Sequence, residues 1–145
     1  MKSISSDDIS INDIITSVTN NYGVPSPMEI DREYISTYIE LLGDEDFSNN
    51  DIEDICGIKS MLDISADTLI AIKTDETKTE KAQELLNLIK NEQQQKFKDY
   101  IDNQYNKAMD GIVFSSGEYT FLIIIGSPEE QDAKAIENII TEFFE

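Results

Sequence analysis

The segment YTFLIII at residues 119–125 constrains the fold more than any other part of the chain. It has the length of a strand, but its residues do not alternate between apolar and polar, as they would in a strand with one face in water. Both faces of this strand must therefore be covered. The sequence predicts a sheet with helices packed on both sides and with residues 119–125 as its central strand.

Two more strands are predicted around this one. The segment GIVFSSGEYTFLIIIG contains two apolar runs joined by a short polar stretch, and Ser116-Gly117 suits the primed turn of a β-hairpin. Earlier in the chain, TLIAIK at residues 68–73 is short, apolar and bounded by polar turns, which is typical of a buried strand. These three strands make up the predicted sheet.

Helical spacing of apolar residues accounts for most of the remaining chain. A long helix is predicted from residue 77, and its apolar stripe fails across residues 91–96 before it resumes at Phe97. This interruption predicts that the helix bends or projects past the core there. The other predicted helices begin after Ser10, cover residues 31–42 and 50–57, and follow a capping box that starts at Ser127.

The predicted fold class is α+β, with N-terminal helices followed by the order β-α-β-β-α. The last strand lies between the other two, which gives a three-stranded antiparallel sheet in the order 2-3-1. The long helix and the C-terminal helix are expected to cover one face, and the N-terminal helices the other. With 145 residues and few Pro and Gly, the chain is predicted to form a single domain over 1–145, in which residues 1–8 are flexible.

The formal net charge of −19 argues against two classes of partner. A field of this sign repels the phosphates of nucleic acids and the head groups of anionic membranes. The charge is uneven, because residues 78–107 contain six Lys and five acids, while the rest of the chain carries 25 acids and five bases. An acidic partner is therefore expected to approach residues 78–107, unless these lysines serve only to keep a helix soluble.

A group of tyrosines within and after this segment is the candidate interaction surface. Tyr100 and Tyr105 lie in the second part of the long helical segment, close to Lys98, and Tyr119 opens the central strand. Tyrosine offers contact area and a hydroxyl group at a low cost in side-chain entropy, so interfaces use it often. The sequence predicts recognition through these four residues; the alternative is that the tyrosines border a small core.

The stretch GDEDFSNNDIEDI at residues 43–55 carries six acids and invites comparison with a calcium-binding loop. An EF-hand loop needs Gly at position 6 and Glu at position 12. A loop that starts at Asp44 has Asn49 and Ile55 at these positions, and a start at Asp46 fails at the same two places. The stretch is predicted to be a solvated turn, with a weak surface calcium site of another shape as the alternative.

The chain contains no His and one Cys, which excludes His-based triads, imidazole or thiolate zinc sites and iron–sulfur clusters. Cys56, between Ile55 and Gly57, is predicted to be a small buried apolar residue. Glycine-rich phosphate loops are missing as well. We predict no catalytic residue, no metal site and no cofactor. Because 30 acids offer many carboxylate pairs, a carboxylate-dependent hydrolase of an extracellular polymer is the alternative.

Four segments together resemble an uncharacterised family of small bacterial domains: DIEDICGI, ADTLIAIK, FKDYIDNQYNKA and GIVFSSGEYTFLIII. The resemblance covers about residues 50–126 and rests on the spacing of Gly57-Ile58, Asp67, Tyr100, Gln104-Tyr105 and Tyr119. Members of this family come mostly from Gram-positive species and are typically lipoprotein-like exported proteins of unknown function.

The resemblance implies an extracytoplasmic domain held at the membrane by a lipid on an N-terminal cysteine, and it implies no catalytic residue. Cys56 lies deep within the domain and cannot be that cysteine, and MKSISSDDIS lacks the apolar core of a signal peptide, so a cytoplasmic location is the alternative. The predicted function is a non-enzymatic binding or accessory domain for a protein, a peptide or a cell-wall component. It would reach the membrane only through an anchor that this sequence does not contain.

Overall fold

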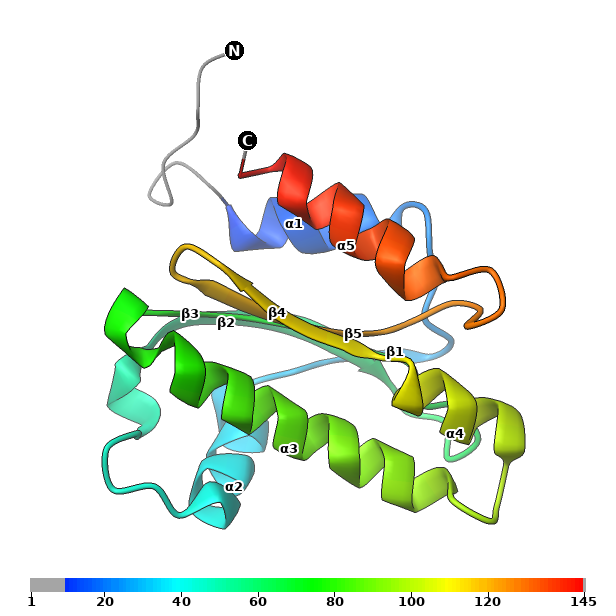
Figure 1. Cartoon of the computed structure of the whole chain (residues 1–145), viewed down its shortest axis with the longest axis horizontal. Coiled ribbons are helices and arrows are strands. Elements are labelled where there is room, and N and C mark those ends of the chain that lie inside the picture. The colour runs from blue at the N-terminus through cyan, green and yellow to red at the C-terminus, as the bar shows by residue number, and fades with distance from the viewer. Residues whose placement is uncertain (1–9, 145) are drawn as a thin grey trace.

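A computed structural model describes residues 10–144, so the prediction of flexibility for residues 1–8 lies outside the described part of the chain. The described residues form one antiparallel sheet between two layers of helices (Figure 1). The strands follow one another across the sheet in the order β1-β2-β3-β5-β4. They are β1 Pro27–Glu29, β2 Ile52–Ser60, β3 Thr68–Thr74, β4 Ile112–Ser116 and β5 Tyr119–Ile124.

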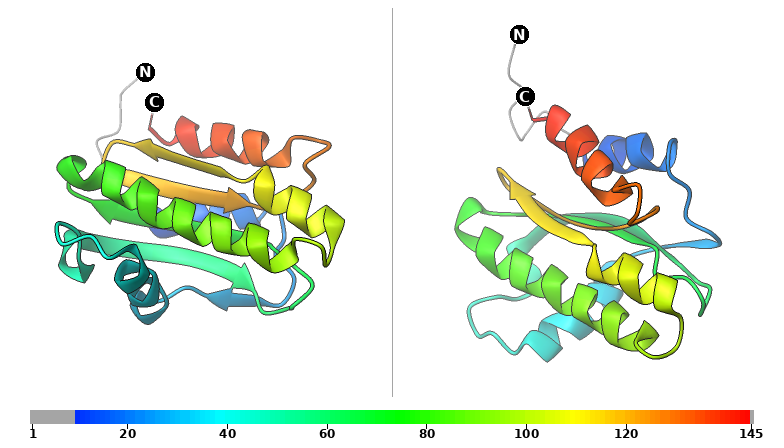
Figure 2. Two further views of the ribbon diagram at one scale, coloured as in Figure 1. Left: turned by 60° about the horizontal axis from the view of Figure 1, so that its bottom comes forward. Right: turned by 45° about the vertical axis from the view of Figure 1, so that its right-hand side comes forward.

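Helices cover both faces of the sheet (Figures 1 and 2). One face carries α1 Ile11–Thr19 and α5 Asp132–Glu142, and the other carries α2 Arg32–Leu42, α3 Thr79–Phe97 and α4 Asp102–Met109. The prediction that the long helix shares a face with the C-terminal helix is therefore wrong. The residues of β5 are buried on both faces, so their pattern does not reveal which helix lies on which side.

The α+β class is confirmed, but the prediction of a three-stranded sheet is wrong. β4, β5 and β3 lie side by side with β5 in the middle, which is the predicted order of these three. The sheet then continues from β3 through β2 to β1, so that β3 is the middle strand of five in the described residues. β1 is three residues long, has an exposed residue at each position and begins with Pro27, so no apolar pattern in the sequence indicates it.

The second missed strand, β2, occupies the segment predicted as a helix over 50–57. A 3-10 turn at Asn49–Asp51 leads directly into it. The pairing of β2 with β3 shifts between Ile52 and Asp54, which marks a β-bulge. Because of the bulge, Ile52 and Ile55 both pack on the side of α2 and α3 although they are three residues apart. This spacing imitates one face of a helix in the sequence.

The buried face of α3 continues across residues 91–96, although no apolar residue stands there. Gln93 takes the core position there and is 7% exposed, and Phe97, one turn later, is fully buried. The helix ends at Phe97, and residues 98–101 form the break before α4. The prediction that the helix bends or projects past the core at residues 91–96 is therefore wrong, and the break comes after residue 97.

Other local signals act at or within one residue of the predicted positions. The Oγ atom of Ser10 accepts a hydrogen bond of 3.3 Å from the backbone N of Asp13 at the start of α1. Helix α2 ends at Gly43, which has the left-handed φ of 65°. The β4–β5 hairpin closes through Gly117 and Glu118, one residue later than predicted, with Gly117 at φ 60°. Among the helices of residues 10–144, none combines the length and the apolar character needed to cross a membrane.

Candidate functional site

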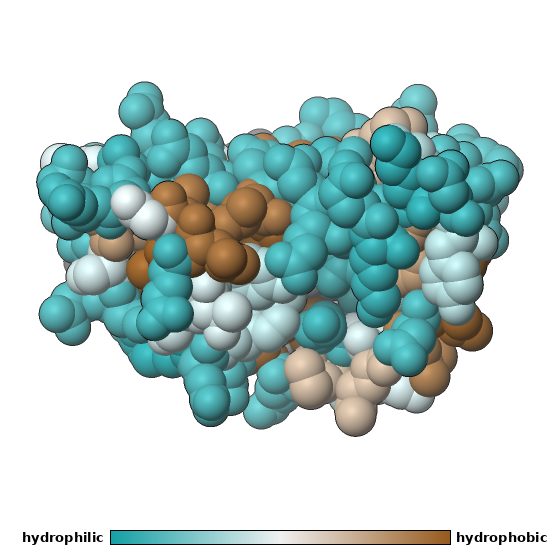
Figure 3. Space-filling model, turned by 90° about the horizontal axis from the view of Figure 1, so that it is seen from below, coloured by the Kyte–Doolittle hydropathy of each residue, from teal (hydrophilic) through white to brown (hydrophobic). Residues whose placement is uncertain are grey.

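Several of the most exposed apolar side chains lie at one end of the molecule. Met61, Leu62 and Ile64 of the β2–β3 loop are 65%, 39% and 59% exposed, and Tyr100 of the α3–α4 turn is 63% exposed. We call these four residues the end surface. They make up four of the seven large apolar residues that are exposed in the described part of the chain. On the lower face, which is mostly hydrophilic, the most prominent apolar patch lies left of the centre, and a smaller group of apolar atoms lies at the right-hand end, where Figure 1 places α4 (Figure 3).

A buried ion pair holds the β2–β3 loop against α4. Lys107 Nζ lies 3.1 Å from Asp67 Oδ1, and the two side chains are 17% and 7% exposed. The hydroxyl of Ser65 donates to the other oxygen of Asp67 at 2.5 Å. The backbone N–H of Ala66 donates to Gln104 Oε1 at 2.8 Å. Side-chain contacts thus fix the base of the loop that carries Met61, Leu62 and Ile64, so this part of the end surface is held in place.

The structure separates the four residues predicted to form the interaction surface. Lys98 and Tyr100 are exposed in the α3–α4 turn, where the ring of Tyr100 stacks on Phe97 with 6.3 Å between centroids. Tyr105 is half-buried against the core on the side of α3. Tyr119 is 2% exposed and packs in the core between the sheet and α1 and α5. Only Lys98 and Tyr100 are therefore available to a partner at the same place.

Sequence reasoning missed Met61, Leu62 and Ile64. They stand in the segment SMLDIS, which has no helical or strand period and follows a strand that was itself not predicted. The available signal was the presence of three large apolar residues in a loop, where water-exposed polar residues are the rule. Asp67 and Gln104, whose spacing contributes to the family resemblance, come together at the base of this same loop.

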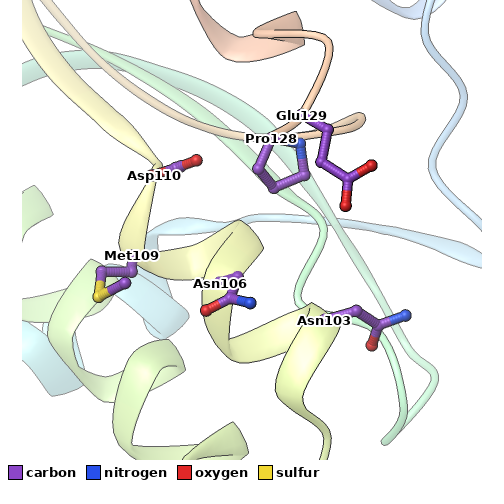
Figure 4. A pocket seen from close by; sticks show the side chains of 6 residues that line it. All are labelled: Asn103, Asn106, Met109, Asp110, Pro128 and Glu129. Atoms are coloured by element: carbon purple, nitrogen blue, oxygen red, sulfur yellow. The ribbon is translucent and has the colours of Figure 1, made fainter.

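A hollow of about 310 Å³ with a mixed polar and apolar lining lies between α4 and the β5–α5 loop (Figure 4). Pro128 and Glu129 of the loop face Asn103 and Asn106 of α4 across it, with Asp110 at one side. The lining combines two carboxylates and two amides with the apolar side chains of Met109 and Pro128, and it is open to solvent. A Lys or Arg side chain suits this lining, because its charged end can meet a carboxylate while its methylene groups lie against apolar atoms.

The acidic stretch at residues 43–55 binds lysines of the same chain. Asp44 Oδ2 lies 2.5 Å from Lys81 Nζ, and Lys78 Nζ donates to the backbone carbonyl of Asp46. The hydrogen bond from Lys81, helped by the backbone N–H of Asp46, holds the pKa of Asp44 below its usual value. In the described residues, no group of three or more acidic or Cys side chains is placed to hold a metal ion. The first acids of the stretch therefore tie it to the start of α3.

Cys56 lies beside a hollow of about 290 Å³ between α1 and β2. Its Sγ atom is 2.9 Å from Asn12 Oδ1, to which the thiol donates. Burial raises the pKa of this thiol, so the protonated form dominates near neutral pH. A protonated thiol is a weak nucleophile. The side chain is half-buried and donates a hydrogen bond, so the prediction that Cys56 is a small buried apolar residue is only partly right.

A family model described as a domain of unknown function (DUF4358) matches residues 45–125 of the chain. The matched range contains four of the five strands, α3, α4 and the whole end surface. No match was found among the curated proteins, and none among the solved structures.

Proposed function

The chain belongs to the DUF4358 family, a family of unknown function, and we propose that this member is a non-enzymatic domain that binds another protein through its end surface. The observation that supports this proposal is the concentration of Met61, Leu62, Ile64 and Tyr100, each at least 39% exposed, on elements that are fixed from behind. Exposed apolar side chains that are grouped and held in place are typical of sites that a partner covers.

The chemistry of the end surface favours a protein or peptide with an apolar patch. Met side chains are unbranched and polarizable, so they adapt to apolar surfaces of different shape. Tyr100 adds an aromatic face with little entropy to lose. Lys98 and Asp99 next to it supply one charge of each sign, so the rim does not select a strongly charged ligand. The net charge of −19 disfavours nucleic acid and an anionic bilayer as alternatives.

The location proposed for this domain is extracytoplasmic. This part of the proposal rests on the resemblance of residues 50–126 to lipoprotein-like exported domains of Gram-positive bacteria. A lipid anchor on a separate segment would then bring the domain to the membrane, and a cell-wall component would be a further ligand. Fractionation of the producing cells, with detection by an antibody against the domain, tests the location; recovery in the cytoplasmic fraction alone would refute it.

Photo-crosslinking tests the binding site itself. A benzophenone amino acid replaces Ile64 in the end surface, and in a matched control it replaces Leu41, which is 63% exposed on α2. In cells that produce the protein, we expect a discrete crosslinked product from position 64 and none from position 41. The double substitution Met61→Ser with Leu62→Ser should remove this product while the thermal unfolding midpoint stays unchanged. Equal products from both positions, or none from either, would refute the proposal.

A further inference from the structure

The two edges of the sheet differ in how well they are protected against pairing with another strand. At one edge, β1 is short and begins with Pro27, and the part of β2 that extends beyond β1 carries the exposed acids Glu53 and Asp54. Short strands, Pro and charged residues are the usual means by which proteins keep a sheet edge from pairing. This edge is therefore protected in the ordinary way.

The other edge has none of these devices. Strand β4 reads Ile-Val-Phe-Ser-Ser, has neither Pro nor a charged residue, and is paired on one side only among residues 10–144. Its pairing with β5 is regular over all five residues, without a bulge. The chain has 41 charged residues out of 145, yet all five residues of this edge strand are uncharged. The edge offers a free row of backbone donors and acceptors.

The register shows which backbone groups point outward. A two-residue hairpin loop closes on a hydrogen-bonded pair, which here is Ser116 with Tyr119. Hydrogen-bonded and non-hydrogen-bonded pairs alternate along an antiparallel ladder. The N–H and C=O groups of Phe114 therefore bond to β5, whereas those of Val113 and Ser115 point away from the sheet. Two residues thus offer four backbone groups to an added strand.

Hollows adjoin the N-terminal end of this edge. A cavity of about 140 Å³ lies between Ile112 and α5, where Ala133 and Lys134 help to line it. It shares Asp110 and Pro128 with the larger hollow described above, so the two adjoin each other. Lys134 Nζ forms an ion pair with Glu137 Oε1 at 2.6 Å. The charges that line the larger hollow are the carboxylates of Asp110 and Glu129.

We propose that the outer edge of β4 receives an extended segment of a partner protein, which adds a sixth, antiparallel strand and places a Lys or Arg at its C-terminal end in the hollow beside Asp110 and Glu129. Antiparallel addition matches every pairing in this sheet and is the more stable arrangement per residue. A strand in this direction ends at the hollow because β4 begins there. The partner residue opposite Ile112 enters the smaller, apolar cavity.

Charge favours a different protein over a second copy of this chain. Two copies would each bring a net charge of −19. If they paired about a two-fold axis at Phe114, Asp110 of one copy would stand opposite Glu118 of the other, and like charges across a strand pair are destabilising. A basic segment gains from the same carboxylates. This edge is separate from the end surface, so either site can fail its test while the other passes.

Peptide binding tests the proposal. The probe is a fluorescein-labelled, amidated peptide of sequence Thr-Val-Thr-Val-Thr-Arg-Lys, and its matched control ends in Glu-Glu. Anisotropy titrations should show at least tenfold weaker binding of the control. A second control with methyl groups on alternate peptide nitrogens should not bind, because it cannot pair with an edge. This control does not depend on the folding of any variant.

Two further readouts place the peptide on β4. In amide hydrogen exchange, the N–H groups of Val113 and Ser115 should become protected when the basic peptide is added, while that of Phe114 is protected already. The substitution Ser115→Pro removes one outward N–H and should weaken binding at least tenfold, whereas Asp110→Asn with Glu129→Gln should abolish the preference for the basic peptide. The proposal is refuted if the basic peptide fails to bind at millimolar concentration, if it binds without protecting Val113 and Ser115, or if the free protein dimerises through β4 in sedimentation experiments.

Discussion

The buried pair between Asp67 and Lys107 predicts an unequal response to the loss of either partner. In the variant Lys107→Met, the Asp67 carboxylate would stay 5% exposed with the hydroxyl of Ser65 as its remaining side-chain donor. Removing one partner of a fully buried ion pair costs about 3–5 kcal/mol. Since the Lys107 side chain is 17% exposed and Ser65 still donates, we expect the lower end, about 3 kcal/mol.

The opposite variant, Asp67→Asn, should cost less. The Asn side chain keeps the shape of Asp and can still accept the hydrogen bond from Ser65. The ammonium group of Lys107 is at the end of a flexible chain and can turn toward water. We therefore expect a loss of about 1.5–2 kcal/mol, at the lower end of the range for one hydrogen bond to a charged group.

A double-mutant cycle measured by urea unfolding separates these effects. The double variant should be about as stable as Asp67→Asn alone, so the coupling between the two positions should equal the loss caused by Lys107→Met, about 3 kcal/mol. Lys98→Met is the matched control, because Lys98 is exposed and has no ion pair within the described residues, and it should change stability by less than about 0.5 kcal/mol. Additive losses, or a larger loss from Asp67→Asn than from Lys107→Met, would refute the reasoning.

Three further variants test other parts of the structure. Gln93→Leu should stabilise the protein by about 1 kcal/mol in urea unfolding, because the Oε1 atom of Gln93 is buried without a hydrogen-bond partner; the exposed Gln95→Leu is its control, and destabilisation of the Gln93 variant would refute the argument. Gly57→Ala should lower stability by about 1–3 kcal/mol in thermal unfolding, since the new Cβ would lie 2.6 Å from the carbonyl oxygen of Leu69. Its control is Gly23→Ala, which should have little effect because an added Cβ at Gly23 has no neighbour within 4 Å. Lys81 lowers the pKa of Asp44, so the contribution of Asp44 to stability is present above the unfolded-state pKa of about 3.9 and is lost as the pH falls through the lower folded-state pKa. The stability difference between wild type and Asp44→Asn should thus be present at pH 7 and vanish at the most acidic pH. A stability difference that does not depend on pH would contradict this argument.

The sequence predicted correctly those parts of the fold that a single local rule determines. The apolar runs of β3 and β5 and the Gly117 turn identify the hairpin and its neighbour without reference to the rest of the chain. Ser10 and Gly43 mark helix ends through hydrogen bonds and backbone conformation that are local as well. These signals do not depend on what the element packs against, so they can be read from a short window.

The parts that could not be predicted depend on contacts between distant segments. The bulge in β2 is defined by its pairing with β3, and it converts strand alternation into the three-residue spacing of Ile52 and Ile55. β1 exists because residues 27–29 pair with residues 58–60, not because of any apolar pattern. For the candidate site, the ion pair joins Asp67 to Lys107 across 40 positions of sequence. No local rule connects two residues at that separation.

The range matched by the family model also shows why the whole chain is needed to explain the fold. Residues 45–125 supply β2 to β5, α3 and α4, but α1 and α5 lie outside it. Leu69, Phe121 and Ile123 have no exposed surface, and they are covered by α1 and α5. A sheet built from the matched residues alone would therefore expose one entire apolar face to water. Burial of apolar surface is the main force that stabilises a fold, and three uncovered side chains of this size would forgo about 1.5–3 kcal/mol each. The matched range is thus a structural core with the candidate binding surfaces on it, and the helices at either end of the chain make that core stable.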